Sequence, residues 1–349
     1  MSSKYAKSAL DAFAALAVAW SAHSAHATTY TFQNVVNSNP ALGGDANFNQ
    51  ELGINDAGLI SGYAGDGTVL PNKGYTVAPP AYTAFTPENF PASVQTQVVG
   101  INGNSPATTV GFWIDGAGNN FGFVDQNGSF TKVMDPNTPT VTPSVNQLTG
   151  VNNANIASGF YLNAAGNAQA YLYNIAAATF TPITLPASFN AVMTTATGVD
   201  NAGDVSGFYV DAAGVTHGFL DVGGTFFTID DPNGNGTNTM LLGLNNNDQA
   251  VGSFVDMNGE TQGLVFNFLA DAFQTISDPG ASATPAFMVN GTTINGTNDQ
   301  GDLVGFYSNG TQVIGLVALP ASVPEPATLT LLAAGLLGMG VFARRRKVG

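Results

Sequence analysis

The side chains that could do chemistry in this chain are few. The sequence has 3 His, 8 Lys plus Arg, 23 Asp plus Glu and no Cys. Between Thr28 and Pro320 the only histidine is His217, and the only lysines are Lys73 and Lys132. Catalytic triads, histidine metal sites and lysine Schiff bases need partners that this inventory lacks. Paired-carboxylate chemistry stays open because Asp is plentiful, but we expect the body of the chain not to be an enzyme.

Most of the aspartates stand in turn sequences between candidate strands. Asp side chains in such turns hydrogen-bond their own backbone, which favours a structural role. The turn positions are Asp56, Asp115, Asp211, Asp256 and Asp299. His217 occupies a strand position where other copies of a repeated pattern have Phe121, Gln169 or Gln262. We interpret it as a packed or half-exposed sheet residue.

One segment resembles a cation-binding loop. Residues Asp231 to Gly236 match D-x-[DN]-x-[DN]-G, with Asp231, Asn233 and Asn235 as the candidate calcium ligands. The twelfth position is Leu242 instead of the bidentate Glu of an EF-hand, and no helices flank the loop. The alternatives are a weak calcium site and a flexible connection, and no other cofactor or metal is expected.

Paired aromatic residues recur in one strand of each unit, as in Phe112-Trp113 and Phe160-Tyr161. Neighbouring strand residues face opposite sides of a sheet, so most of these rings are expected in the core. Trp113, beside Asp115 and Asn119, is the candidate for a sugar-stacking surface.

The charge distribution separates the body from the two ends. The formal net charge is −15 and only 9% of residues are charged. The cations are concentrated at the two ends. Such a body would repel phosphate, so nucleic acid is not an expected partner.

The N-terminus has the layout of a secretory signal peptide. Lys4 and Lys7 precede the apolar run Ala12 to Trp20, and Ala25-His26-Ala27 supplies the small residues of a cleavage site. The run is too short to span a bilayer. We predict a signal peptide over 1–27, cleaved by signal peptidase after Ala27, and the alternative is a buried N-terminal helix.

The C-terminus has three parts in order. Residues 320–326 form a linker containing Val323-Pro324-Glu325-Pro326, in which the two prolines keep the backbone extended. Residues 327–349 contain an apolar stretch to Ala343 that, as a helix, could just cross the ~30 Å hydrocarbon core. The basic cluster Arg344, Arg345, Arg346 and Lys347 follows and would hold the end in the cytoplasm.

This three-part tail resembles the PEP-CTERM sorting signal of Gram-negative bacteria. The resemblance implies recognition by an exosortase, cleavage near Pro324-Glu325-Pro326, and transfer from a transient membrane anchor to the cell surface or extracellular matrix. It therefore implies exosortase, signal peptidase and an exopolysaccharide or cell envelope as partners. The alternative is an ordinary single-pass anchor.

The body consists of a repeated pattern, G-x-N-x-x-G-x-[VIL]-x-G-[FY]. Copies begin at Gly53, Gly100, Gly150, Gly198, Gly243 and Gly296, roughly every fifty residues. The fourth copy illustrates four short strand candidates, 195–200, 204–211, 215–222 and 225–230, joined by Asn- and Gly-rich turns. No stretch of the body shows a sustained helical period. We predict an all-β, six-bladed β-propeller over 28–319, followed by the C-terminal hydrophobic helix.

The last strand of units two to five shares F-x-x-[VI], as in Phe130 with Val133 and Phe226 with Ile229, and unit one has only Phe85. The sixth unit lacks this strand, whereas Thr29 to Val35 has the signature before the first unit begins. We predict that this N-terminal strand closes the last blade and so removes exposed sheet edges.

The third strand has a second signature, Thr216-His217-Gly218-Phe219, echoed by Gln169-Ala170-Tyr171 and Gln262-Gly263-Leu264. With the glycine pattern, it resembles the HAF repeat of exported bacterial proteins from about Phe48 to Val317, a family without an established activity. The first hypothesis is therefore an exported, non-enzymatic structural or adhesive module of the envelope or biofilm matrix. The alternatives are a carbohydrate-binding propeller and a carboxylate-dependent glycan hydrolase or lyase.

Overall fold

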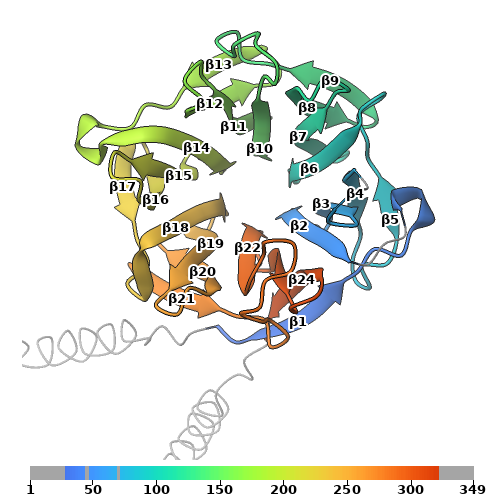
Figure 1. Cartoon of the computed structure of the whole chain (residues 1–349), viewed down its shortest axis with the longest axis vertical. Coiled ribbons are helices and arrows are strands. Elements are labelled where there is room, and N and C mark those ends of the chain that lie inside the picture. Colours follow the sequence, from blue (N-terminus) through green and yellow to red (C-terminus); the bar gives the residue numbers. More distant parts are fainter. Residues whose placement is uncertain (1–27, 44–46, 69–70, 322–349) are drawn as a thin grey trace, which may run out of the picture. The chain divides into compact units, whose positions relative to one another are not determined.

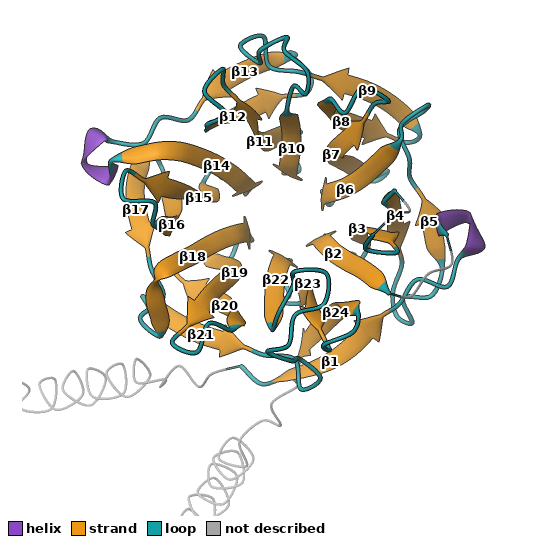
Figure 2. Ribbon diagram, viewed as in Figure 1, coloured by secondary structure: helices purple, strands orange, loops and turns teal. Residues whose placement is uncertain are grey.

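Residues 28–43, 47–68 and 71–321 are described by the structure, a computed structural model (Figure 1). The predicted signal peptide with Ala25 and Ala27, the Val323–Pro326 motif, the apolar stretch after it and the Arg344–Lys347 cluster lie outside these residues. Helical structure in the described part is limited to two single turns, η1 (Pro40–Leu42) and η2 (Ala187–Phe189) (Figure 2). No helix among the described residues has the length and apolarity needed to span a bilayer.

Strands follow one another in sets of four, one set for each copy of the sequence pattern. Repeat 1 contains β2 (Phe48–Ile54), β3 (Ile60–Gly65), β4 (Lys73–Val77) and β5 (Phe85–Pro87). Repeat 2 contains β6 (Gln95–Ile101), β7 (Thr108–Ile114), β8 (Asn120–Gln126) and β9 (Ser129–Val133). Repeat 3 contains β10 (Asn146–Val151), β11 (Ile156–Leu162), β12 (Ala168–Asn174) and β13 (Thr179–Pro182).

The second half of the chain repeats this arrangement. Repeat 4 contains β14 (Ala191–Val199), β15 (Val205–Asp211), β16 (Thr216–Val222) and β17 (Thr225–Ile229). Repeat 5 contains β18 (Gly234–Leu244), β19 (Gln249–Asp256), β20 (Thr261–Asn267) and β21 (Ala272–Ile276). Repeat 6 contains β22 (Thr292–Thr297), β23 (Leu303–Ser308) and β24 (Val313–Pro320), and β1 (Tyr30–Val35) pairs with β24.

Each repeat is an antiparallel sheet whose strands pair in sequence order. Single parallel bridges, Phe48 with Val313 and Thr216 with Asn238, connect some neighbouring sheets. The chain divides into two units, 32–319 and the two ends. Within the unit 32–319 the sheets are arranged around a common centre, with β2, β6, β10, β14, β18 and β22 innermost (Figure 1).

The first glycine of the pattern explains how the innermost strands approach one another. Each innermost strand has an irregularity of register just before this glycine. A Cβ on Gly53 would lie 2.9 Å from the Val99 carbonyl oxygen, and one on Gly296 would lie 2.9 Å from the Leu52 carbonyl oxygen. The first and last repeats thus meet through the same kind of contact as consecutive repeats, which closes the ring.

Neighbouring sheets pack through a large side chain set against a glycine. The large residues are Val98, Leu148, Leu241 and Ile294, all fully buried on innermost strands. The facing third-strand glycines are Gly74, Gly122, Gly218 and Gly263, whose added Cβ atoms would lie 2.6 to 3.2 Å from those side chains. Burying such aliphatic side chains contributes roughly 1.5 to 3 kcal/mol each. The packing between sheets therefore uses two further recurring positions, one two residues before the first glycine of the pattern and one on the third strand.

Two interfaces depart from this rule. Between repeats 3 and 4 the glycine is replaced by Ala170, and the buried residue opposite is only Ala196. Between repeats 6 and 1 the large residue is Glu51, whose carboxylate occupies the place of a Cβ on Gly315. The second interface is the one that closes the ring.

Candidate functional site

The turn after each innermost strand begins with the Asn of the pattern. Asn55 Oδ1 accepts hydrogen bonds from the Ala57 and Leu59 backbone N–H groups, both at 3.0 Å. Asn152 and Asn298 hold their turns in the same way. The Asn side chain thereby fixes the tight turn between the first two strands of its sheet.

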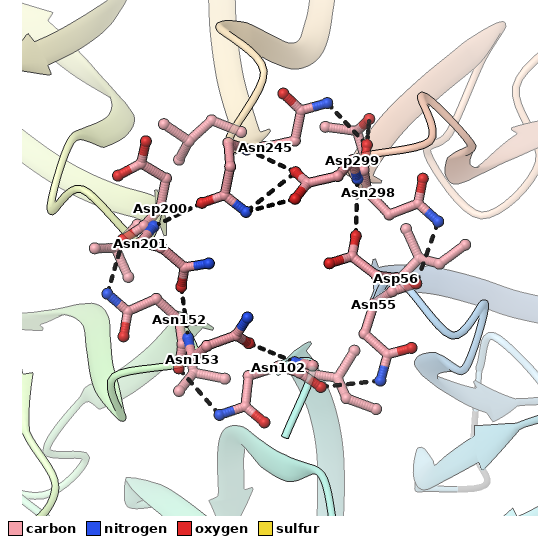
Figure 3. Close-up of a pocket in the computed structure, with 18 residues that line it drawn as sticks. Asn55, Asp56, Asn102, Asn152, Asn153, Asp200, Asn201, Asn245, Asn298 and Asp299 are labelled. Atoms are coloured by element: carbon pink, nitrogen blue, oxygen red, sulfur yellow. Dashed lines mark hydrogen bonds between the residues drawn. The ribbon is translucent and has the colours of Figure 1, made fainter. Parts of the chain in front are cut away.

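The other end of each Asn side chain reaches the next repeat. Asn55 Nδ2 donates to the Asn102 carbonyl at 2.9 Å, and Asn298 Nδ2 donates across the closure to the Asn55 carbonyl at 3.2 Å. The remaining donations are Asn102 to Asn152, Asn152 to Asp200, and Asn245 to Asn298. These residues surround the centre in Figure 3. We call this set of five bonds the asparagine ring.

Asp200 interrupts the asparagine ring. Its Oδ1 accepts from the Ala202 and Asp204 N–H groups at 2.9 and 2.8 Å, as the Asn oxygens do elsewhere. An Asn at this position would have the Nδ2 donor where Asp200 has its second carboxylate oxygen. An acceptor therefore replaces the donor that would bond to Asn245 of the next repeat. Burial raises the pKa of Asp200. At this single step the ring lacks its hydrogen bond.

The residues that follow the ring asparagines form a second layer. Backbone N–H groups donate to side-chain oxygens of the next repeat, from Asn201 to Asn246 at 2.8 Å and from Asp299 to Asp56 at 2.9 Å. Gly103 donates in the same way to Asn153 at 2.7 Å but has no side chain with which to accept. The turn predictions are confirmed for Asp115, Asp211 and Asp256. Asp56 and Asp299 instead accept from the neighbouring repeat.

The central pocket inside these layers is small and polar (Figure 3). Its volume is about 70 Å³, room for a few water molecules. Asp56, Asp200 and Asp299 are its ionisable residues, and no Lys, Arg or His is among the described residues that line it. The groups around the pocket are thus mainly the amides and carboxylates that join the repeats by hydrogen bonds.

The structure places His217 on β16, away from this centre. Its Nδ1 lies 2.9 Å from Asp230 Oδ1, its Nε2 lies 3.7 Å from Asp211 Oδ2, and its ring stacks on Tyr209 at 5.0 Å. The side chain is 19% exposed, which confirms a half-buried sheet residue. Hydrogen bonds from the Val215 N–H and its neighbours lower the pKa of Asp211.

Trp113 is covered by other aromatic rings. Phe90 stacks on it at 4.4 Å with an interplanar angle of 3°, and Phe121 packs at 4.9 Å. The Lys132 ammonium lies 3.3 Å from the centre of the Phe121 ring. A sugar could not stack on the ring face that Phe90 occupies.

Asp231 takes part in a connection between repeats 4 and 5. Its Oδ1 accepts from the Asn233 N–H at 2.8 Å, and its own N–H donates to Thr239 at 3.2 Å. Asp135 and Asp278 make the same turn between other repeats, without the cation-loop sequence. Asn235 Oδ1 accepts from Thr237. Among residues 28–43, 47–68 and 71–321, no three or more His, Cys, Asp or Glu side chains are grouped to hold a metal ion.

Sequence reasoning missed one buried acid, Glu51, and one half-buried acid, Glu88. Glu51 is fully buried, and burial raises its pKa to about 8 against a hydrogen bond of 2.5 Å from the Tyr75 hydroxyl. Burial also raises the pKa of Glu88 to about 7, and Thr109 donates to its carboxylate. The sequence does distinguish Glu51, because the residues at the same position of the other repeats are aliphatic.

Comparison with known proteins identifies one segment. Residues 322–347 match the PEP-CTERM protein-sorting motif. The chain carries a PEP-CTERM sorting motif. No match was found among curated protein sequences.

The chain is also similar to several solved structures. TolB from Acinetobacter baumannii has 10% identity and a TM-score of 0.48, over 76% of this chain and 65% of TolB. The SapL1 lectin in complex with alpha methyl fucoside has 9% identity and a TM-score of 0.48, over 79% of this chain and 97% of the lectin. Trypanosoma rangeli sialidase has 8% identity and a TM-score of 0.45, over 89% of this chain and 61% of the sialidase. The chain spans less than two thirds of the length of TolB.

Proposed function

We propose that this protein is exported, anchored transiently in the membrane and sorted by an exosortase to the cell surface or extracellular matrix of a Gram-negative bacterium. The match of residues 322–347 to the PEP-CTERM motif carries this proposal. The signal-peptide layout at 1–27 and the basic cluster Arg344 to Lys347 support it. Signal peptidase, the exosortase, and an exopolysaccharide or the envelope are the proposed partners.

The body, in this proposal, is a six-bladed β-propeller of HAF-type repeats that acts as a non-enzymatic structural or adhesive module. The pairing of β1 with β24 supports six sheets of four strands, with the last sheet completed by the N-terminal strand. The asparagine ring supports a rigid body, since its hydrogen bonds tie turns of successive repeats together.

Replacing Glu325 and Pro326 by Ala tests the sorting. The full chain with both substitutions should stay in the membrane fraction, whereas Ala321→Ser, just outside the matched residues 322–347, should be processed normally. Fractionation and the mass of the released protein measure the result. Normal release of the Glu325→Ala, Pro326→Ala chain would contradict handling by an exosortase.

The absence of a cofactor is a separate part of the proposal. The turn at Asp231 is held by its own backbone, so calcium or a chelator should leave the melting temperature unchanged. Stabilisation by calcium that Asp231→Asn abolishes would contradict this part. Turnover of an exopolysaccharide, abolished by substitution of an Asp, would contradict the non-enzymatic role.

Carbohydrate binding is a second candidate function. An open cavity of about 410 Å³ beside Tyr161 in repeat 3 favours it, and this volume falls in the roughly 300 to 1,000 Å³ range of small-molecule sites.

A further inference from the structure

One position of the second strand carries an aromatic ring in five of the repeats. It lies two residues after the last glycine of the sequence pattern, directly after the Phe or Tyr position with which the pattern ends. The residues are Trp113, Tyr161, Tyr209, Phe254 and Tyr307. The repeats share one backbone arrangement. A comparison of the side chains that pack against these rings therefore shows at which repeat a ring is left uncovered.

Two of the rings each pack against two other aromatic side chains. Trp113 contacts Phe90, from the connection that enters its repeat, and Phe121, its partner on the third strand. Tyr209 likewise contacts Phe189, at 5.3 Å, and His217, at 5.0 Å. Two aromatic neighbours therefore complete the packing of this position in repeats 2 and 4.

Two further rings are covered without such a pair. Phe254 is 2% exposed and Tyr307 is 4% exposed. The Tyr307 hydroxyl and ring edge contact the backbone at Gly280, where an added Cβ would lie 3.1 Å from the hydroxyl. These positions leave no space for a ligand.

Tyr161 lacks both aromatic neighbours. Its partner on the third strand is Gln169, and the connection 134–145 that enters repeat 3 contains no aromatic residue. No ring contact involves Tyr161 in the part of the chain that the structure describes. The vacant space is the cavity of about 410 Å³ lined by Tyr161, Gln169, Phe180 and the Asp135–Asn137 turn.

The lining combines an aromatic side chain with hydrogen-bonding groups. Gln169 and Asn137 offer amides, Asp135 offers a carboxylate, and Thr179 and Thr184 offer hydroxyls. The Asp135 charge lies near the Tyr161 hydroxyl and, with burial as the larger cause, raises the pKa of Tyr161. No Lys, Arg or His is among the described lining residues. An anionic ligand would meet repulsion here, whereas a neutral polyhydroxylated ring would find both an apolar and a polar surface.

A smaller cavity continues the first one. Its volume is about 200 Å³, and it shares Gln169, Ala170, Ile183 and Thr184 with the larger cavity. The two together extend along β13 toward the start of β14. A ligand with more than one ring could therefore occupy both.

We propose that repeat 3 binds a neutral hexose unit of a polysaccharide. The sugar stacks on Tyr161 in the space that aromatic side chains fill in repeats 2 and 4, the Asp135 carboxylate accepts hydrogen bonds from its hydroxyl groups, and the Gln169 amide donates or accepts them. The inference rests on the second candidate function, carbohydrate binding, and names its site and ligand class. The sorting proposal does not depend on it.

The experiment titrates the full chain with methyl glycosides of glucose, galactose and mannose and with the corresponding neutral trisaccharides, using ligand-observed NMR. Tyr161→Ala should weaken binding by about tenfold, and Tyr161→Phe by less than about threefold, since the stacking ring remains. Methyl glucuronide should bind more weakly than methyl glucoside because of the Asp135 charge.

A blocking variant separates loss of the site from loss of the fold. Gln169→Phe should fill the cavity as Phe121 fills the space beside Trp113, abolishing binding without lowering the melting temperature. Gln262→Phe, at the matching position of repeat 5, should leave binding unchanged. If the wild-type chain binds and neither Tyr161→Ala nor Gln169→Phe weakens it, this site is wrong while carbohydrate binding stands. If the wild-type chain binds none of these glycosides, both are wrong.

Discussion

Asp200 illustrates the scale of single residues, where one atom decides an interaction. An Asn at this position would hold the turn through Oδ1 and donate through Nδ2, as Asn152 does to the Asp200 carbonyl at 2.7 Å. The carboxylate can fulfil only the first role, because an ionised acid has no donor. The ring therefore lacks one hydrogen bond that its sequence pattern would otherwise supply.

Asp200→Asn should stabilise the chain by about 1 kcal/mol at neutral pH, the usual contribution of one hydrogen bond. Because burial raises the pKa of Asp200, the folded state disfavours the ionised acid, and the advantage of Asn should grow as pH rises through that pKa. Urea unfolding of the full chain measures it. Asn152→Asp, the reverse change, should destabilise, and equal stability of all three chains would contradict this role of the ring.

Glu51 is the second residue with an unusual environment. It occupies the position of Val98, Leu148 and Ile294, and its Oε2 has no hydrogen-bond partner among the described residues. Its pKa rises from the ordinary 4.5 to about 8. The groups that face it are the hydroxyl of Tyr75 and the backbone at Gly315. At neutral pH the folded chain therefore holds a proton that the unfolded chain has released.

Stability should consequently fall as pH rises from about 4.5 to about 8, by at most about 5 kcal/mol from this group. Glu51→Gln, which is always neutral, should remove this part of the pH dependence. Melting temperatures across the window measure it. Glu88→Gln serves as the comparison, since its pKa rises only to about 7. A Glu51→Gln chain with the wild-type pH slope would show that Glu51 is ionised when folded.

At the scale of elements, adjacent sheets are matched in side-chain size. Gly122 faces Leu148 and Gly218 faces Leu241, whereas the interface between repeats 3 and 4 pairs Ala170 with Ala196. The two interface types thus use different pairs of side chains. Such positions should be energetically coupled.

Ala196→Leu alone should destabilise the chain by about 1 to 3 kcal/mol, because the larger side chain meets the Ala170 methyl. Combining it with Ala170→Gly should recover most of the loss, since the pair then matches Gly218 and Leu241. A double-mutant cycle from denaturant unfolding gives the coupling. Strictly additive effects of the two changes would rule out this matching.

The strands were predictable from sequence because turn residues and alternation are local. The predicted strands 195–200 and 204–211 correspond to β14 and β15, but β14 begins earlier, at Ala191, because Ala191 and Met193 still pair with β15. The candidate site was less predictable. Trp113 was singled out by residue type, yet Phe90, from the connection that enters its repeat, stacks on it. Tyr161 is left uncovered because the connection 134–145 contains no aromatic residue. No local sequence pattern marks such an absence.

At the scale of the whole molecule, stability depends on joining segments far apart in the sequence. Val35 of β1 is fully buried in one cluster with Val304 and Val317 of repeat 6 and Ile60 of repeat 1. Asn298 and Asp299 add the hydrogen bonds of the closure to Asn55 and Asp56. The first and last repeats are thus held by both apolar packing and polar contacts.

Val35→Ala should lower the stability of the whole ring by about 2 kcal/mol, not only that of repeat 6. In a Trp20→Phe background, Trp113 fluorescence reports unfolding of repeat 2, and far-UV circular dichroism reports all strands. The two transitions should shift together. A shift in circular dichroism without one in Trp113 fluorescence would show that the repeats unfold independently.

The pairing of β24 has a mechanical consequence. β24 lies between β23 and β1, so it is an inner strand of its sheet even though it is the last strand that the structure describes. The chain continues from it toward the sorting tail. A force applied through that tail would therefore have to break the hydrogen bonds of β24 to both β23 and β1 at once. A chain whose last strand lay at the edge of its sheet would lose that strand at a lower force.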